Sequence, residues 1–302
     1  MSQIKPHRGV VTIAHRGVNR WRRGHPWIYR SDVADEGGAT APGVVPVADP
    51  AGRFIGQALF SPASEIRLRL IESTEAPLDQ AWWVHRLAAA AARRAGIDAN
   101  AWRVVHGEGD GLPSLVVDRY DRWLVVQLLS AGLETMRGTI LDALEEVLQP
   151  EGILLRHDVA VRRHEGLPEE VVLARGNVPR QVEVQEGPVR WLAAPWDGQK
   201  TGAFLDQRPN RLRAGELARA GGRALDCFSY HGSFALHLAR KATEVTALDV
   251  SAGALARGAE HAAMNGLTNI TWREGDAFET LREMERTGER FDTIVVDPPA
   301  FA

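Results

Sequence analysis

Carboxylates stand at or just after the ends of four short runs between residues 223 and 297, which we interpret as strands, the first of them buried. Asp226 lies in the first run. Asp249 ends the second, where a carboxylate can accept hydrogen bonds from both hydroxyls of a ribose. Asp276 follows the third run, where it can read the edge of an adenine. Asp297 follows the fourth, and the two prolines after it fix the chain beside a reacting group.

The segment after the first run has the composition of a ligand-binding loop. Small residues at Ser229, Gly232 and Ser233 let a ligand lie against the backbone at the start of a helix. The spacing is not the GxGxxG of a dinucleotide site. Taken singly, Asp249 or Asp276 could simply cap the helix that follows it. Four acidic strand ends in register favour a ligand site instead.

The elements that must position these residues alternate regularly from residue 222 onward. We predict strands at residues 223–227, 244–249, 270–273 and 291–296, and helices at 233–240, 252–265 and 278–287. This alternation is typical of parallel βαβ units in a doubly wound α/β fold. In such a sheet, ligands bind outside the carboxyl ends of the strands, which is where the acidic residues stand.

Two further regions precede this one. Short apolar runs at residues 8–14, 44–47, 53–60 and 65–70 are separated by turn signals and predict a small β-barrel. A helix is expected at residues 78–95. Strand-like runs at 104–107, 114–119, 123–129, 152–156, 182–186 and 189–193, with a helix at 134–148, predict a second, α+β unit over residues 100–195.

Length and composition restrict the class of protein only broadly. The 302 residues are 44% apolar and 25% charged, the balance of a soluble globular protein of two or three domains. The chain has no run of about 18 apolar residues, which argues against an integral membrane protein, and its first residues have no apolar signal core, so we expect a cytoplasmic protein. One cysteine forms no internal disulfide, and the histidines have no metal-ligand spacing, so we predict no metal.

Charge is distributed unevenly. Residues 1–31 contain seven Lys and Arg and no acidic residue, so this segment is +7 and the remainder of the chain, whose total is −3, is −10. Arginine forms forked hydrogen bonds to phosphate, and Trp21, Trp27 and Tyr29 lie among the basic residues. This basic arm predicts an RNA-contacting surface. An arginine-rich genome is the alternative explanation for the number of arginines, although not for the absence of acids.

Three motifs resemble a known family. Residues 197–208 (DGQKTGAFLDQR) resemble its GQKTGxxxDQR element, residues 107–120 (GEGDGLPSLVVDRY) match another, and residues 24–27 (GHPW) with 67–70 look like its PUA domain. The acidic strand ends resemble class I S-adenosylmethionine-dependent methyltransferases. The family is that of the ribosomal large subunit methyltransferase I, which is similar to cytosine-5 RNA methyltransferases.

The resemblance implies a fold and a function. It implies a PUA-like RNA-binding domain over residues 1–75, a middle α+β domain over 76–195, and a Rossmann-like methyltransferase domain over 196–302. The expected activity is methyl transfer from S-adenosyl-L-methionine to a cytosine of 23S rRNA, at C5. A homodimer is left open. Because sulfonium is cationic, a site rich in aspartate with aromatic faces is suited to the cofactor.

The expected site residues fall into three groups. The catalytic residues are Asp297, Pro298 and Pro299. The cofactor-binding residues are Phe204, Asp206, Asp226, Phe228, Ser229, Tyr230, Gly232, Ser233, Asp249, Asp276 and Ala277. The RNA-binding residues are Arg16, Arg20, Arg22, Arg23, Lys200 and Arg208.

The chain departs from the family where it stops, five residues after Asp297. Only four of the seven strands of a class I methyltransferase are counted, so we expect a fragment of a longer protein. The nucleophilic cysteine that C5 chemistry needs is expected beyond residue 302. Cys227 is interpreted as a small buried hydrophobe. A natural short form is the competing explanation, and two other functions stay open: an amino-group methyltransferase, and an RNA-binding module without catalysis.

Overall fold

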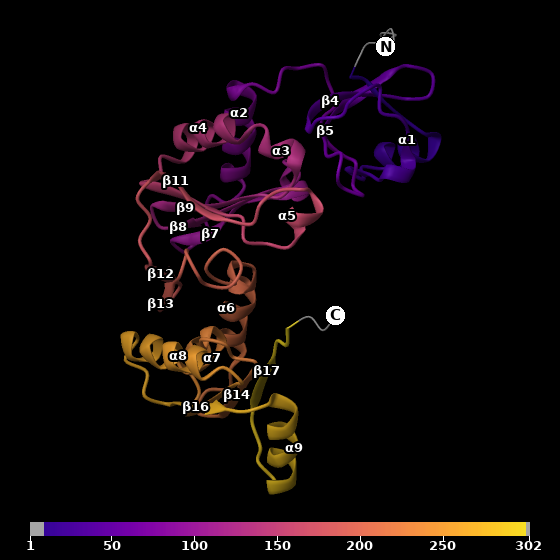
Figure 1. Cartoon of the computed structure of the whole chain (residues 1–302). Helices are drawn as coiled ribbons and strands as arrows, with labels where there is room; N and C mark the ends of the chain where they lie inside the picture. The colour runs from indigo at the N-terminus through magenta and orange to yellow at the C-terminus, as the bar shows by residue number, and fades with distance from the viewer. Residues whose placement is uncertain (1–8, 300–302) are drawn as a thin grey trace. The chain divides into compact units, whose positions relative to one another are not determined.

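The structure is a computed structural model that describes residues 9–299 (Figure 1). It divides into two compact units. The first contains the described residues up to 97, with residues 102–180 and 195–197. The second contains residues 98–101 and 181–194 and the described residues from 198 onward. Among residues 9–299, no helix is both long and apolar enough to cross a membrane.

The first part of the first unit is a mixed six-stranded sheet with strand order β2-β6-β5-β4-β1-β3. Its elements are β1 (Val11–Ile13), α1 (His15–Arg22), β2 (Trp27–Ile28), β3 (Val33–Asp35), β4 (Gly43–Ala48), β5 (Phe54–Phe60) and β6 (Leu68–Glu72). Strands β1 and β4 pair in parallel, whereas the pairs β1–β3, β2–β6, β4–β5 and β5–β6 are antiparallel. A separate core holds these strands together and includes Val11, Ile28 and Phe60.

The sequence prediction missed part of this sheet. Helix α1, β2 and β3 were not expected, and the predicted strand at residues 8–14 begins outside the described residues. Helix α1 has only a few apolar residues, but Val18 and Trp21 are buried, and Gly17 lies where a Cβ would come within 3.3 Å of the carbonyl oxygen of Asp32. The helix is therefore stabilised by packing rather than by its own composition.

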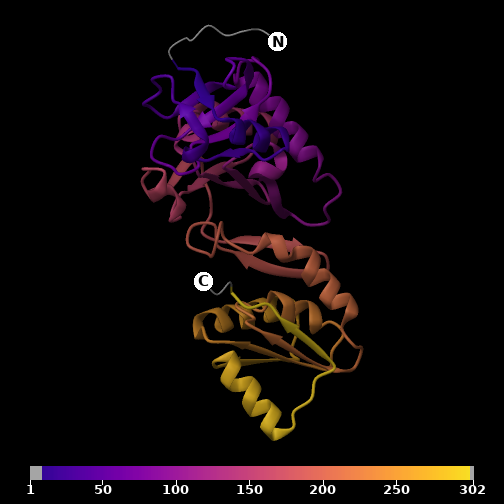
Figure 2. The same cartoon turned by 90° about the vertical axis from the view of Figure 1, so that its right-hand side faces the viewer.

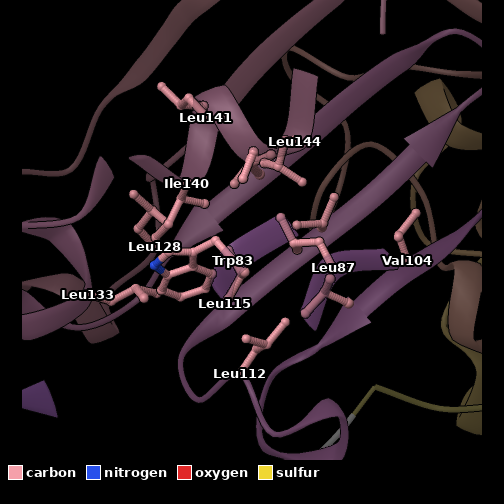
Figure 3. Packing of buried hydrophobic residues seen from close by; sticks show 14 of the residues in the cluster. Trp83, Leu87, Val104, Leu112, Leu115, Leu128, Leu133, Ile140, Leu141 and Leu144 are labelled. Atoms are coloured by element: carbon pink, nitrogen blue, oxygen red, sulfur yellow. The ribbon is translucent and has the colours of Figure 1, made fainter. Parts of the chain in front are cut away.

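The second part of the first unit is a five-stranded sheet of order β11-β10-β9-β8-β7. Its elements are α2 (Gln80–Ala92), β7 (Ala101–His106), β8 (Leu115–Tyr120), β9 (Trp123–Leu128), α3 (Ala131–Glu134), α4 (Arg137–Leu148), β10 (Gly152–Arg156), α5 (Val161–His164) and β11 (Val171–Gly176). Figure 3 shows Trp83 and Leu87 of α2 among leucines of the strands and of α4. The predicted helix 134–148 is two helices, and α5 and β11 were not expected.

Buried polar contacts join these two parts. The Arg69 guanidinium lies 2.7 Å from a Glu165 carboxylate oxygen, and both side chains are buried. The Gly132 N–H donates to Ser61 Oγ at 3.4 Å, and a Cβ at Gly132 would lie 2.9 Å from the Phe60 backbone. Since a buried ion pair needs exact geometry to offset its desolvation, this contact constrains how the two sheets meet.

The second unit contains a parallel four-stranded sheet with strand order β16-β15-β14-β17 and a separate two-stranded antiparallel sheet, β12-β13. Its elements are the hairpin β12 (Val182–Glu186) and β13 (Val189–Ala193), α6 (Arg208–Leu217), β14 (Arg223–Cys227), α7 (Ser233–Leu238), β15 (Glu244–Asp249), α8 (Ala252–Met264), β16 (Ile270–Glu274), α9 (Ala277–Thr287) and β17 (Thr293–Val296). Helix α9 lies on the opposite face of this sheet from α8 (Figure 2). The doubly wound arrangement therefore matches the predicted βαβ alternation, and the strand order reverses between β14 and β17.

Two differences from the predicted organisation concern this unit. Helix α6 was not expected, and it begins with a proline in its first turn, where the missing N–H costs nothing. The hairpin β12–β13 was included in the middle domain, but it groups with the second unit. The domain boundaries after residues 75 and 195 stay a prediction.

Candidate cofactor site

Asp226 is buried at the carboxyl end of the central strand β14. Its Oδ2 accepts a hydrogen bond of 2.9 Å from the backbone N–H of Ala235 in the first turn of α7. Burial raises the pKa of Asp226 to about 8, the Ala235 hydrogen bond lowers it, and the nearby Asp297 and Asp249 carboxylates raise it further. Asp226 therefore keeps its proton near neutral pH and anchors the helix that follows the loop.

The loop between β14 and α7 has an unusual backbone. Phe228 has φ +61° and Tyr230 has φ +51°, a region that non-glycine residues rarely adopt. Each such residue costs about 1–3 kcal/mol and persists where the surroundings enforce it. The enforcing contacts are visible: the Ser229 N–H donates to the Leu248 carbonyl at 3.0 Å, and the Tyr230 N–H donates to Asp249 Oδ2 at 2.8 Å. The strain marks this loop as a candidate functional segment.

Asp249 joins this loop to the end of β15. Its Oδ2 accepts from Tyr230 and its Oδ1 accepts from the Ser251 N–H at 2.9 Å. Each carboxylate oxygen has two acceptor positions, so both can still accept a hydroxyl. Ser251, rather than Asp249, caps α8, because its Oγ accepts from the Ala254 N–H. The capping alternative for Asp249 is therefore wrong.

The helix-capping alternative is correct for Asp276. Its Oδ1 accepts a hydrogen bond of 3.0 Å from the Glu279 N–H, so Asp276 is the N-cap of α9. The side chain is exposed and Ala277 is buried. Capping is enough to explain an aspartate here, and the role of Asp276 and Ala277 in reading adenine stays a prediction.

Asp297 meets the 197–208 element at the end of β17. Gln207 Nε2 donates to Asp297 Oδ1 at 3.3 Å, and Asn210 Nδ2 donates to Gln207 Oε1 at 2.6 Å. Pro298 and Pro299 follow in an exposed, irregular stretch. The structure therefore brings together two motifs that are 90 residues apart.

Aromatic rings surround the loop. The Phe204 and Tyr230 rings meet edge to face, with centroids 5.7 Å apart, and the Phe228 and Phe278 rings do so at 6.1 Å. Lys200 Nζ lies 4.6 Å from the centroid of the Phe204 ring. These rings provide the faces that a cation prefers.

Lys200 and Asp206 pair with each other. Lys200 Nζ lies 2.8 and 3.0 Å from the two carboxylate oxygens of Asp206. Lys200 was expected to contact RNA and Asp206 the cofactor, and the ion pair engages both side chains inside one loop. Arg208, also expected to contact RNA, is the first residue of α6 and is half-buried.

Gly232 and Ser233 form the junction of the loop with α7. Gly232 has φ +72°, and a Cβ there would lie 2.4 Å from the Trp272 ring. A Cβ added at Gly258 of α8 would lie 2.4 Å from the same ring. Trp272 thus packs between two glycines and holds the loop against α8, which the spacing of small residues alone did not show.

A buried ionic network supports the 197–208 element and was missed by sequence reasoning. Arg211 donates to both Glu186 oxygens at 2.7 and 2.5 Å and to the Phe204 carbonyl at 2.8 Å, while His237 Nε2 lies 3.1 Å from Glu186 Oε1. Burial alone would raise the pKa of Glu186, but the Arg211 and His237 contacts outweigh it and hold that pKa low. These residues are far apart in sequence, so no local pattern signals them.

Cys227 is fully buried at the end of β14 and packs with Leu225 and Met284. Burial, helped by the adjacent Asp226, raises the pKa of its thiol to about 11. A thiol in this state does not supply a thiolate at neutral pH. Within residues 9–299 no group of three or more His, Cys, Asp or Glu is arranged to hold a metal.

The predicted RNA-binding arginines belong to the first unit. Arg16 and Arg20 of α1 both pair with Asp32, which is fully buried, and the Arg20 guanidinium lies 4.8 Å from the Tyr29 ring centroid. Arg22 and Arg23 are exposed. A hollow of about 680 Å³, here called the basic hollow, is lined by Arg16, Asn19, Arg20, Arg23 and His25.

Family models match most of the chain. Residues 11–73 match a PUA-like domain, and residues 103–302 match an S-adenosylmethionine-dependent methyltransferase. The PUA-like match lies over the six-stranded sheet, and the methyltransferase match includes the site just described.

Curated relatives are named "Ribosomal RNA large subunit methyltransferase I". One from Alteromonas mediterranea is 37% identical over 289 residues, which cover 93% of this chain and 72% of the relative. One from Tolumonas auensis is 38% identical over 291 residues, covering 93% and 73%.

Solved structures show the same fold. A methyltransferase structure from Streptococcus mutans superposes with a TM-score of 0.81 at 21% identity, covering 96% of this chain and 77% of that one. A methyltransferase solved in complex with SAH superposes with a TM-score of 0.83 at 22% identity, covering 97% and 77%. With the sequence relatives, these findings show that the chain belongs to the ribosomal RNA large subunit methyltransferase I family of S-adenosylmethionine-dependent methyltransferases.

Proposed function

We propose that the protein transfers a methyl group from S-adenosylmethionine to a cytosine of 23S rRNA, at C5. The rRNA substrate is supported by the name of the curated relatives. The observation that carries the assignment of the site is Asp249, whose two oxygens are oriented by the Tyr230 and Ser251 N–H groups at the carboxyl end of β15. An acid so held is suited to a ribose diol.

The residues of the site fit this cofactor. Ser229 is buried, and its Oγ has no hydrogen-bond partner within residues 9–299, so a polar group of a ligand can satisfy it. When bound, S-adenosylmethionine supplies a methyl group on a cationic sulfonium. Asp249 would hold its ribose, Asp276 and Ala277 its adenine, and the rings of Phe204, Phe228 and Tyr230 would face the cation. Gly232 and Ser233 let the ligand approach the backbone, and Asp226 holds the start of α7.

Asp297 is proposed to orient the target base. A base in a duplex must leave the stack to reach the site, and a carboxylate can then accept a hydrogen bond from its amino group. Gln207 fixes the Asp297 side chain through the contact of 3.3 Å, and Pro298 and Pro299 restrict the backbone after it. In this arrangement Gln207 is a positioning residue and Asp297 touches the substrate.

The nucleophile is proposed to lie outside these 302 residues. Cytosine C5 is not nucleophilic, so a thiolate must first add at C6, and the buried Cys227 thiol is protonated near neutral pH. Ile294 and Val296 of the edge strand β17 are 54% and 57% exposed, as expected if further elements of the full protein cover them. We therefore propose that the methyltransferase sheet continues beyond its four strands in the full-length protein.

RNA docking is assigned to the PUA-like part. Arg16, Arg20, Arg22 and Arg23 belong to or directly follow α1, and three of them line the basic hollow. Their charge suits the phosphate backbone of RNA. A ribosomal substrate would place the reaction in the cytoplasm. Lys200 and Arg208 would contact RNA near the site, with Lys200 first leaving Asp206.

Isothermal titration with S-adenosylmethionine tests the site. We expect Asp249→Ala to weaken binding about 10- to 150-fold, because a charge-assisted hydrogen-bond pair is worth about 1.5–3 kcal/mol. Glu260→Ala, at an exposed residue of α8, is the matched control and keeps the affinity. Unchanged binding in Asp249→Ala, with unfolding temperature also unchanged, contradicts the assignment.

One alternative keeps the cofactor and changes the target atom. Asp297-Pro298-Pro299 resembles the loop of amino-group methyltransferases, which need no thiol, although in this chain the aromatic Phe301 comes after an intervening Ala300 and both lie outside the described residues. Mass mapping of the modified nucleotide decides between the two. A methyl group on the exocyclic nitrogen excludes the C5 proposal. RNA binding that falls steeply with salt, with no thermal shift from S-adenosylmethionine, would instead indicate an RNA-binding module.

A further inference from the structure

A second hollow of the first unit, here called the junction pocket, has a volume of about 510 Å³. Its lining comes from the Gly24-His25-Pro26 turn, the end of β6, helix α2 and the 3-10 helix at Gly107–Asp110, and includes Gly24, Pro26, Glu72, Arg86, Glu108 and Gly111. Two of the three motifs that resemble the family therefore meet at this pocket, and neither is used by the cofactor site.

Glu108 offers an oriented carboxylate to the pocket. Its Oε1 accepts a hydrogen bond of 2.7 Å from the Trp27 indole N–H. A carboxylate has about four acceptor positions, so one indole leaves most of them for a ligand. Glu72, also in the lining, is already engaged: its oxygens accept from Trp82, Ser73 and Thr74. Glu108 is thus the acidic group with capacity to receive donors.

Arg86 also lines the junction pocket. Its Nη2 donates to the Gly111 carbonyl at 3.1 Å, and its guanidinium lies 5.2 Å from the Trp82 ring centroid. Gly111 has φ +67°, and a Cβ there would come within 2.8 Å of Arg86 Nη2, so the glycine is needed for this placement. The Arg86 Nε is buried without a hydrogen-bond partner among the described residues. The arginine is therefore positioned in advance, with donor capacity left over.

The charges of the junction pocket identify its ligand class. Glu72, Glu108 and Arg86 give this lining a formal charge of −1, unlike the basic hollow, which is lined by three arginines and suits phosphate. A planar group with two donors for a carboxylate and an acceptor for the arginine fits such a pocket. Among the RNA bases, guanine presents two adjacent donors, N1–H and the N2 amino group, to one carboxylate, and its O6 accepts from arginine. Cytosine and adenine present a single amino donor, and uracil a single ring N–H.

We propose that the junction pocket binds an unpaired guanine of the substrate RNA, with its N1–H and N2 amino group on Glu108 and its O6 on Arg86. The neighbouring phosphate then reaches the basic hollow, because Arg23 and His25 line that hollow while Gly24 and Pro26 line the junction pocket. Adjacent residues of one turn thus face the two sites. This inference rests on the proposed RNA substrate and adds a base preference to it.

Fluorescence anisotropy with the 302-residue chain tests the proposal. The probes are 5′-fluorescein nonamers U₄XU₄ in which X is guanine, inosine, adenine, cytosine or uracil. We expect guanine to bind about tenfold more tightly than uracil or adenine, and inosine, which lacks the N2 amino group, to lie between them. In Glu108→Gln the amide oxygen can still accept from Trp27, but its N–H₂ opposes the guanine donors, so the guanine preference disappears.

Glu65→Gln is the matched control, because Glu65 is exposed in the same unit and outside the pocket lining. It removes the same charge and is expected to keep the preference. Equal affinities for all five nonamers in the unsubstituted chain overturn the guanine proposal, as does a preference that persists in Glu108→Gln. Salt-dependent binding without base preference refutes only this inference, whereas no binding to any nonamer refutes RNA docking as well.

Discussion

Gly232→Ala is the sharpest perturbation of the cofactor loop that the structure suggests. Gly232 has φ +72°, and an added Cβ would lie 2.4 Å from Trp272 Cη2 and 2.5 Å from Cζ3. A Cβ added at Gly258 of α8 would lie 2.5 and 2.4 Å from the same two ring atoms, but Gly258 does not have a positive φ and lies within a helix. The two glycines therefore share the steric contact and differ in backbone conformation.

The expected costs follow from these two terms. Overpacking against Trp272 costs about 1–3 kcal/mol at either position. The left-handed conformation adds about 1–2 kcal/mol for alanine at Gly232, whereas alanine at Gly258 regains about 1 kcal/mol of helix propensity. The free energy of unfolding of the second unit should fall by about 2–5 kcal/mol in Gly232→Ala and by about 0–2 kcal/mol in Gly258→Ala.

Native-state hydrogen exchange of the β14 amides, followed by mass spectrometry, measures this unfolding free energy without interference from the first unit. The steric term is isolated by repeating both substitutions in a Trp272→Leu background. There Gly258→Ala should become stabilising by about 1 kcal/mol, and Gly232→Ala should keep only its backbone cost.

Calorimetry with S-adenosylmethionine separates the site from the scaffold. Gly232→Ala should weaken binding more than tenfold, because it displaces the loop that the ligand approaches, and Gly258→Ala should leave binding nearly unchanged. Equal destabilisation by the two substitutions would refute the backbone argument. Failure of Trp272→Leu to relieve either of them would refute the steric argument.

Three further predictions follow from the buried groups of the second unit. Burial raises the pKa of Asp226 to about 8 from 3.8. Between about pH 4 and pH 8 the folded unit therefore holds a proton that the unfolded chain has released. The free energy of unfolding should fall by up to about 1.4 kcal/mol per pH unit as the pH rises through this range. Urea unfolding at pH 6 and 7.5 checks this, and a slope that persists in Asp226→Asn contradicts it. Glu186→Gln leaves the Arg211 guanidinium without its counter-charge and should cost about 3–5 kcal/mol; the double variant with Arg211→Met should recover most of that loss, and no recovery would argue against the pair. Cys227→Ala should cost about 1–2 kcal/mol of stability and leave methyl transfer intact, because the thiol is buried with a pKa of about 11. Lost transfer with retained cofactor binding would make Cys227 the nucleophile.

Local patterns were sufficient where an element is determined by its own sequence. The strands β14 to β17 lie within two residues of the predicted ranges, because each is a short run bounded by turn residues. Strands β14 and β15 are largely buried, whereas β16 and β17 are partly exposed. Their acidic ends share one edge of the sheet because the four strands run parallel. Helix α1 was missed because it has few apolar residues, and Trp21 is buried only by packing in the sheet core. Strand β11 pairs with β10 and begins with four apolar residues, Val171–Ala174, and this run was overlooked.

Capping and pairing decided which acidic residues are available. Asp249 and Asp276 have equivalent places in the sequence pattern, yet Asp276 caps α9 while Asp249 is held by the Tyr230 and Ser251 N–H groups. The difference arises because Ser251 is present to cap α8 in place of Asp249. Lys200 shows the same effect, since its ion pair with Asp206 places it inside the loop rather than on an open basic surface.

The sequence by itself determined the family, the βαβ alternation and the edge of the sheet where the acidic residues gather, because these depend on residue types at short, regular spacing. Only the tertiary structure showed the Trp272 contact with two glycines, the network of Glu186, Arg211 and His237, and the junction pocket. Those features join residues from 14 to 87 positions apart, as with Gly258 and Trp272 or Gly24 and Gly111, and such separations leave no periodic signal in the chain. Contacts of this kind exist only once the strands have paired and the helices have packed.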